Sequence, residues 1–107
     1  MVVKTTFTRY DTVTIELHQY EATDSVCVRL VSWDAGYPEV FATITKCFPD
    51  AEIPSANYAY VDVNNCPWAM DFIKEFNLGR DTGIKKNTLW CVYPLVDFNL
   101  DECEKYA

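Results

Sequence analysis

Apolar and polar residues alternate along three runs in the first half of the chain, at residues 12–18, 26–33 and 40–45. In the first of these runs, Val13, Ile15 and Leu17 are separated by polar side chains. A period of two is typical of β-strands, because successive side chains point to opposite faces of a sheet. The links between the runs are too short to hold a crossover helix. We therefore expect an antiparallel meander of three strands.

A different spacing marks residues 62–79. Apolar side chains there recur at intervals of three and four, which is the period of one helical face; they are Ala69, Phe72, Ile73 and Phe76. Pro67 suits the first helical position, and Asn65 or Cys66 before it can act as the N-cap. We expect Gly79 to end this helix with a positive φ.

The remaining segments indicate short strands and loops. Residues 5–10 have strand-forming side chains with weak alternation and could form an edge strand, and residues 58–63 predict a short strand. The polar run at 80–87 is typical of a mobile loop. Residues 88–98 form the most apolar segment, in which Pro94 predicts a bulge or a strand break because proline cannot donate to a ladder.

The chain ends with a helix-start pattern, in which Asn99 can cap one helical turn and Glu102 occupies the capping-box position. A length of 107 residues, half of them hydrophobic, suits a single α+β domain spanning residues 1–107. We expect an antiparallel sheet of about five or six strands with one amphipathic helix packed on it.

The charge balance narrows the choice of partner. Nine basic and sixteen acidic residues give a net charge of −7, which opposes direct nucleic acid binding and binding to an anionic membrane. A protein partner with a basic surface is favoured instead. The carboxylates concentrated near the C-terminus are the candidate interaction residues, namely Asp97, Asp101, Glu102 and Glu104.

The cysteines and the N-terminus indicate the compartment. Residues 1–7 lack the apolar run of a secretion signal, and no segment approaches the roughly 20 apolar residues of a membrane span. The five cysteines have no close pairs, so they predict buried thiols and neither a disulfide framework nor a metal site. We therefore expect a cytoplasmic protein.

Three motifs could support chemistry. Cys66 at a helix N-terminus could have a lowered pKa and act as a nucleophile, yet nothing places His18, the one histidine, beside it. The tripeptide at residues 81–83 matches that of aspartic proteases but lies in a polar stretch, which favours a turn. Asp62 and its asparagine neighbours lack the spacing of a calcium loop, and an Asx turn is the favoured interpretation.

Aromatic side chains are numerous, and they include Trp33, Tyr58, Tyr60, Trp68, Trp90 and Tyr93. They could stack on single-stranded nucleic acid, but that mode needs a basic groove. Packing in the core and at its rim is favoured, and exposed aromatics beside acidic groups would suit a protein interface. The basic cluster of Arg80, Lys85 and Lys86 is interpreted as part of a solvated loop.

Residues 60–68, the helix that follows them, and residues 91–98 together resemble DUF4313, a domain of unknown function. The positions that match its motifs are Asn64, Asn65, Cys66, Pro67, Trp68, Tyr93 and Pro94. The resemblance implies an origin on conjugative elements or phages of gut bacteria. It implies no catalytic residue, metal site or cofactor.

These observations favour a non-catalytic, acidic interaction protein of mobile-element or phage origin. Such a protein could inhibit a host defence complex by occupying its basic, nucleic-acid-binding groove. Two alternatives stay open: a small thiol-dependent enzyme that uses Cys66, and a ligand-binding domain with an aromatic pocket.

Overall fold

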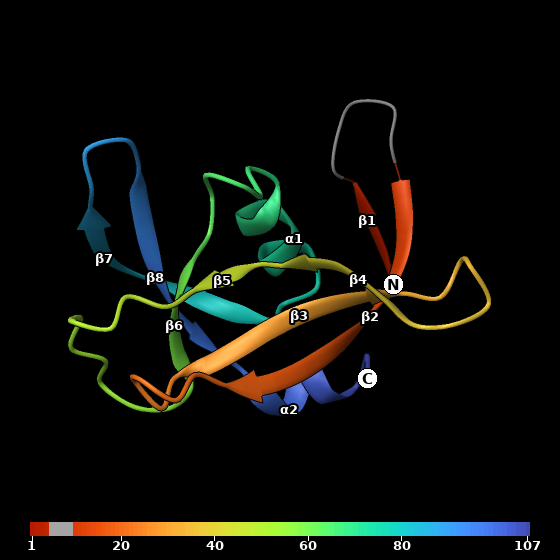
Figure 1. Cartoon of the computed structure of the whole chain (residues 1–107), viewed down its shortest axis with the longest axis horizontal. Coiled ribbons are helices and arrows are strands. Elements are labelled where there is room, and N and C mark those ends of the chain that lie inside the picture. The colour runs from red at the N-terminus through yellow and green to blue at the C-terminus, as the bar shows by residue number, and fades with distance from the viewer. Residues whose placement is uncertain (5–9) are drawn as a thin grey trace.

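The computed structural model describes residues 1–4 and 10–107, and these residues form two four-stranded antiparallel sheets (Figure 1). The first sheet has the order β1-β2-β3-β4, with bounds Val2–Lys4, Tyr10–Gln19, Val26–Ser32 and Glu39–Thr43. The second sheet has the order β5-β6-β8-β7, with bounds Thr45–Lys46, Tyr58–Val61, Val92–Phe98 and Gly79–Asn87. The helices are α1 (Ala69–Glu75) and α2 (Leu100–Glu104).

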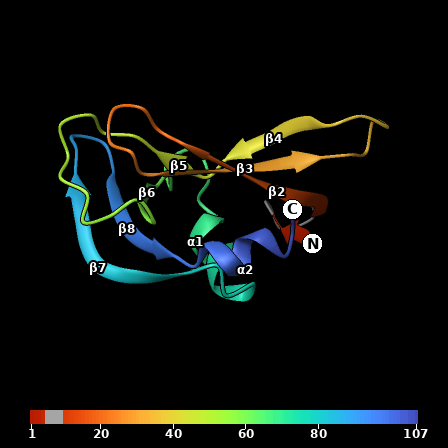
Figure 2. The same cartoon turned by 90° about the horizontal axis from the view of Figure 1, so that it is seen from below.

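The fold class is α+β, as the sequence predicts, but the expected single sheet of five or six strands with one helix is wrong in its count. Both sheets contribute to one main hydrophobic cluster, in which the largest fully buried side chains include Leu30, Ile44 and Phe98. The two helices lie in the angle between the sheets (Figure 2). No helix of the described residues has the length and apolar character that crossing a membrane requires.

The predicted meander is confirmed by β2, β3 and β4. In the register of β2 and β3, Ile15 lies opposite Leu30, and both side chains are buried. Tyr10 begins β2, whereas the rest of the edge strand expected at residues 5–10 lies outside the described residues. The two ends of the chain meet at β2, since Val13 N–H donates to Met1 O and Ile15 N–H donates to Tyr106 O, each at 2.9 Å.

The strand expected over residues 40–45 is divided at Ile44, where the chain passes from the first sheet to the second. The Ile44 N–H donates to Val28 O at 3.0 Å, and its carbonyl accepts from the Asp62 N–H at 2.8 Å. The Ile44 side chain is fully buried. This residue therefore joins the two sheets through both its backbone and its side chain.

The mobile loop expected at residues 80–87 is wrong, because these residues form most of β7 and pair with β8. β7 is an edge strand, and most of its side chains are exposed, so they can be polar. Its backbone forms the hydrogen bonds of the strand with the apolar β8. β8 continues through Pro94, and the irregular register lies opposite it on β7, between Asp81 and Lys85. There Thr82 Oγ1 donates to Leu95 O at 2.8 Å.

The predicted amphipathic face of α1 is confirmed by the burial of Ala69, Phe72 and Ile73. The expected helix ends are wrong. The N-cap position is Trp68, with no side-chain cap, so Pro67 precedes the helix. At the other end Asn77 has the positive φ, of 55°.

The C-terminus of α1 is a Schellman motif, in which the N–H of Leu78 donates to Ile73 O at 2.9 Å. Gly79 therefore has a different role from the one expected. A Cβ at this position would lie 2.8 Å from both Asp97 O and Val96 Cγ1, so Gly79 allows β7 to approach β8 closely.

The expected cap of α2 is confirmed, since Asn99 Oδ1 accepts a hydrogen bond from the Glu102 N–H at 3.1 Å. The second hydrogen bond of a capping box, from the Asn99 N–H to the Glu102 side chain, does not form at this helix start. The Asn99 N–H donates to Leu78 O at 2.8 Å, and the Glu102 carboxylate accepts from Lys105 Nζ at 2.7 Å.

Candidate functional site

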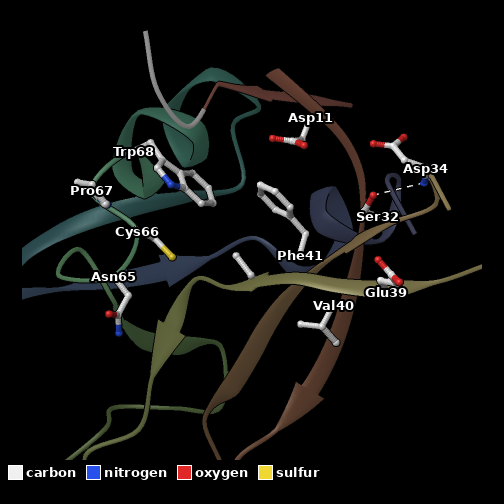
Figure 3. A pocket seen from close by; sticks show the side chains of 11 residues that line it. Asp11, Ser32, Asp34, Glu39, Val40, Phe41, Asn65, Cys66, Pro67 and Trp68 are labelled. Carbon is white, nitrogen blue, oxygen red and sulfur yellow. Dashed lines mark hydrogen bonds between the residues drawn. The ribbon is translucent and has the colours of Figure 1, made fainter. Parts of the chain in front are cut away.

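An open cleft of about 730 Å³ lies between the β3–β4 hairpin and the turn that leads into α1 (Figure 3). One wall comes from residues 65–68 of that turn, and the other from β4 and the neighbouring ends of β2 and β3. The cleft therefore lies where the two halves of the chain meet.

Two aromatic rings from the opposite walls contact each other in the cleft (Figure 3). The ring centroids of Phe41 and Trp68 are 6.1 Å apart, with an interplanar angle of 43°. Trp68 also makes an edge-on contact with the buried Phe72, at 6.0 Å between centroids. Both cleft rings are half-buried, and the contact with Phe72 holds the Trp68 ring in place.

Carboxylates form the acidic rim, which we define as Asp11, Asp34 and Glu39. Asp34 and Glu39 are exposed and flank the turn of the β3–β4 hairpin, whereas Asp11 is half-buried on β2. Neither Asp34 nor Glu39 forms an ion pair with a described residue. No lysine, arginine or histidine is among the described residues that line the cleft. The cleft therefore combines aromatic surface with negative charge, a combination that attracts cations.

The wall at residues 65–68 is built by a buried carboxylate. Asp62 Oδ1 accepts from the Asn65 N–H at 3.2 Å, and Asp62 Oδ2 accepts from Asn65 Nδ2 at 2.8 Å. A turn closed by the Asp62 side chain forms here as expected, but its hydrogen bond reaches three residues on and it does not cap α1, which begins at Ala69. Asn65 occupies both oxygens of the Asp62 side chain. Among the described residues there is no cluster of three or more His, Cys, Asp or Glu side chains that could hold a metal ion.

Cys66 lies at the base of the cleft with little accessible surface. Its Sγ donates to Thr43 O at 3.9 Å. Burial, with a smaller contribution from the negative charge of Asp62, raises the pKa of the Cys66 thiol to about 11. The lowered pKa expected from a helix N-terminus is therefore wrong, because the seven-residue helix begins only at Ala69 and the loss of solvation dominates.

His18 does not lie near this thiol. Its Nε2 forms a hydrogen bond with the Glu16 carboxylate, and both side chains are exposed. Cys66 contacts Thr43 on β4, whereas His18 is on β2, and β3 lies between these two strands. The geometry gives no support to a catalytic pair of Cys66 and His18.

The family-motif positions separate into two places. Asn65, Cys66, Pro67 and Trp68 line the cleft, and Asn64 is exposed in the same turn. Tyr93 and Pro94 belong instead to β8 and do not line the cleft. Tyr93 lies in a second apolar cluster, where its ring centroid is 5.1 Å from that of Phe48.

The candidate interaction residues near the C-terminus do not line the cleft. Asp97 accepts from Asn57 Nδ2 at 2.5 Å and from Arg80 at 3.1 Å, and Glu102 pairs with Lys105. Asp101 and Glu104 are exposed on α2. Two of the four predicted carboxylates are thus engaged within the molecule, which weakens the acidic surface expected there.

Sequence reasoning missed the acidic rim. Asp34 and Glu39 lie in and beside the short link between the second and third alternating runs, next to Trp33, and this local pattern was the available signal. The tripeptide at residues 81–83 lies within β7, at the irregular register, and the turn expected there is therefore wrong. The Gly83 N–H donates to Asp81 Oδ1 at 3.0 Å within this irregular stretch of the strand.

The predicted aromatic residues have three different environments. Trp68 lines the cleft, and the three tyrosines belong to the second apolar cluster (Tyr58, Tyr60 and Tyr93). Trp33 and Trp90 have exposed fractions of 54% and 90%. The expected packing in the core is therefore confirmed for the tyrosines and wrong for these two tryptophans.

Comparison with known proteins gives one match. The model of DUF4313, a domain of unknown function, matches residues 14–107. The match extends beyond the second half of the chain, where the motif positions lie, and includes β3, β4 and the residues that line the cleft, apart from Asp11. No curated protein and no solved structure matches the chain.

Proposed function

Because the chain belongs to the DUF4313 family, which has no defined function, we propose a role from the cleft itself. The protein is a non-catalytic binding protein whose cleft accepts a basic segment of a protein partner. The observation that supports this role is the Phe41–Trp68 ring pair beside the carboxylates of Asp34 and Glu39.

The chemistry of the cleft suits a lysine or arginine side chain. The methylene stem of such a side chain can pack along the rings of Phe41 and Trp68, and its charged end can reach the acidic rim. Cation–π contacts contribute about 0.5–2 kcal/mol, depending on solvent exposure. Several contacts from one basic segment are therefore needed for a specific complex.

The partner in this proposal is a nucleic-acid-binding defence complex of the host, which the protein meets in the cytoplasm and inhibits. This role agrees with an origin on a mobile element or phage, where a small acidic protein can occupy a basic groove. The net charge of −7 supports it, because a strongly acidic protein is steered toward basic surfaces and repelled from nucleic acid.

Two other functions compete with this proposal. A thiol-dependent enzyme needs a reactive Cys66, whose raised pKa and burial work against it. A ligand-binding domain would use the same aromatic cleft, with a small organic cation as its ligand. The ligand-binding alternative differs from the proposal in the size of the ligand, which is a small cation in the first case and a protein segment in the second.

The test is a titration of the protein with a fluorescently labelled arginine-rich peptide at low and moderate salt. In the double variant Asp34→Asn/Glu39→Gln we expect binding to weaken about tenfold, which corresponds to about 1.4 kcal/mol. Asp50→Asn/Glu52→Gln is the matched control, because it removes two carboxylates from the exposed 48–57 loop, outside the cleft. If both double variants bind the peptide equally weakly, the affinity depends only on the net charge of the protein, and the proposal of a specific cleft is contradicted.

Two further measurements identify the class of ligand. Tetramethylammonium should compete with the peptide only weakly if the cleft binds a protein segment, and binding of this cation at the affinity of the peptide would favour the ligand-binding alternative. Pull-down from host lysate should give a salt-sensitive complex that Asp34→Asn/Glu39→Gln loses. A clean negative across salt concentrations would count against the inhibitor role.

A further inference from the structure

The tip of the β7–β8 hairpin presents two large apolar side chains to solvent. Leu89 and Trp90 have exposed fractions of 93% and 90%, the highest among the large hydrophobic residues described. An indole and a leucine side by side at a hairpin tip are costly to leave in water, and such exposed apolar groups commonly mark an interaction site. The hairpin extends away from the helices (Figure 1).

Hydrogen bonds hold this tip in a defined shape. Thr88 Oγ1 accepts from the Cys91 N–H at 3.1 Å, and the Thr88 N–H donates to Cys91 O at 2.9 Å. The Thr88 hydroxyl also donates to Cys91 O at 2.9 Å. An ordered tip loses less conformational entropy when it binds, so Trp90 is pre-positioned as an anchor.

The tip has a positive charge within an acidic protein. Lys85 and Lys86 are the only charged residues between Asp81 and Asp97 in the sequence. Lys46 lies near Lys86, since Lys46 Nζ and Lys86 Nζ lie 5.8 and 5.5 Å from the centroid of the Phe48 ring, and Lys85 belongs to the opposite face of β7. The hairpin therefore offers an apolar end with a collar of three lysines.

The cleft has the complementary chemistry, with two aromatic rings and the exposed carboxylates of Asp34 and Glu39 on the acidic rim. We propose that the β7–β8 tip of one molecule docks in the cleft of a second copy of this chain. Trp90 and Leu89 of the first copy contact Phe41 and Trp68 of the second, and the lysine collar faces the rim. This inference rests on the proposed function, because it requires a cleft that binds basic segments.

The contact is heterologous, because the tip and the cleft are different surfaces and no tip residue lines the cleft of its own molecule. A dimer joined in this way still has one free tip and one free cleft, so association continues into rings or open chains. Self-association also competes with the basic partner for the cleft. A membrane is the less favoured partner of the tip, since a protein of net charge −7 is repelled by anionic lipid.

Sedimentation measures the self-association under reducing conditions, which exclude disulfides through Cys91. The average mass of the wild-type protein should rise above 12.3 kDa between about 10 μM and about 1 mM, the range expected for a small interface, and return to the monomer value at high salt. A tip variant, Leu89→Ser/Trp90→Ser, and a cleft variant, Asp34→Lys/Glu39→Lys, should each stay monomeric. The matched control Asp101→Lys/Glu104→Lys, at exposed positions of α2 that do not line the cleft, should associate like the wild type.

Mixing the two monomeric variants gives the decisive result. The tip variant retains a cleft and the cleft variant retains a tip, so the mixture should form a dimer that grows no further. A wild-type protein that stays monomeric throughout, or a mixture that does not dimerise, would overturn the proposal. Binding to phosphatidylserine vesicles that is lost in the tip variant and kept in the cleft variant would also overturn it, by assigning the tip to a membrane.

The arginine-rich peptide separates this inference from the proposed function. The tip variant should bind that peptide as tightly as the wild-type protein does, because its cleft is unchanged. If self-association fails while peptide binding persists, only the further inference is wrong. If the peptide also fails to bind, the proposed function is wrong as well.

Discussion

The carboxylate of Asp62 holds Asn65 by two hydrogen bonds, one from the backbone N–H at 3.2 Å and one from the side-chain amide at 2.8 Å. Asp62 is buried, and its own N–H donates to Ile44 O at 2.8 Å. Asp62 thus links Ile44, where the chain passes between the two sheets, to the turn that forms a wall of the cleft. The position of Trp68 in the cleft depends on this turn.

Replacement of Asp62 by alanine should lower the free energy of unfolding by about 1–3 kcal/mol, because it removes both hydrogen bonds and leaves their partners unsatisfied. Asn65→Ala removes only the side-chain bond and should cost about 1 kcal/mol. Urea denaturation measures both effects. Asn64→Ala, at an exposed position of the same turn, is the control, and a loss at this position equal to that of Asp62→Ala would contradict the role of the carboxylate.

Gly79→Ala should destabilise the protein by about 1–3 kcal/mol through overpacking, because a Cβ would lie 2.8 Å from Asp97 O and Val96 Cγ1. The comparison is Gly36→Ala, where no atom lies within 4 Å and only the φ of 84° opposes a side chain, at about 1 kcal/mol. In thermal unfolding, the Tm of Gly79→Ala should be lower than the Tm of Gly36→Ala. The opposite ranking would show that the two strands can separate at little cost.

Asn99→Ala should lower the free energy of unfolding by about 1 kcal/mol, since the side chain caps the first turn of α2. Asn99→Asp retains an oxygen acceptor and should remain close to the wild type. Glu102→Gln should change stability by less than about 1 kcal/mol, because it affects only an exposed ion pair with Lys105. Chemical denaturation of the three variants tests the cap, and a neutral Asn99→Ala would contradict it.

The buried thiols predict a loss of stability in alkaline solution. Burial raises the pKa of Cys66 and of Cys103 to about 11, from an ordinary value of 9.0. Between about pH 9 and pH 11 the unfolded chain releases thiol protons that the folded chain retains, so the free energy of unfolding falls as the pH rises. Below pH 9 both states keep these protons, and the thiols make no pH-dependent contribution.

Urea denaturation from pH 8 to pH 11 measures this dependence. Cys66→Ala/Cys103→Ala should be less stable at every pH, owing to the space left in the core, but its stability should fall less steeply above pH 9. Identical slopes for the variant and the wild-type protein would contradict the raised pKa values. Other groups that ionise in this range are shared by both proteins and cancel in the comparison.

The sequence by itself determined those elements whose pattern is local. Alternation located the meander of β2, β3 and β4, and apolar spacing located the buried face of α1, because side-chain direction follows the period of each element. The cap at Asn99 was also predictable, since the residue and the N–H that it accepts from are three positions apart.

The tertiary structure decided how these elements combine. β7 has the composition of a solvated loop and is a strand because the apolar β8 supplies its hydrogen-bond partners. Asn77, and not Gly79, has the positive φ that ends α1. Gly79 is needed instead because a side chain there would collide with β8. The division at Ile44, which separates the two sheets, follows from contacts with Val28 and Asp62, distant in the chain.

The cleft depended most strongly on the tertiary structure. Asp11, Asp34 and Trp68 are far apart in the sequence, and strand pairing with the turn before α1 brings them to one surface. Burial likewise reversed the expected pKa shift of Cys66, since solvation depends on neighbours that a linear pattern does not show. Local periodicity thus specified the elements, and contacts between distant residues specified the site.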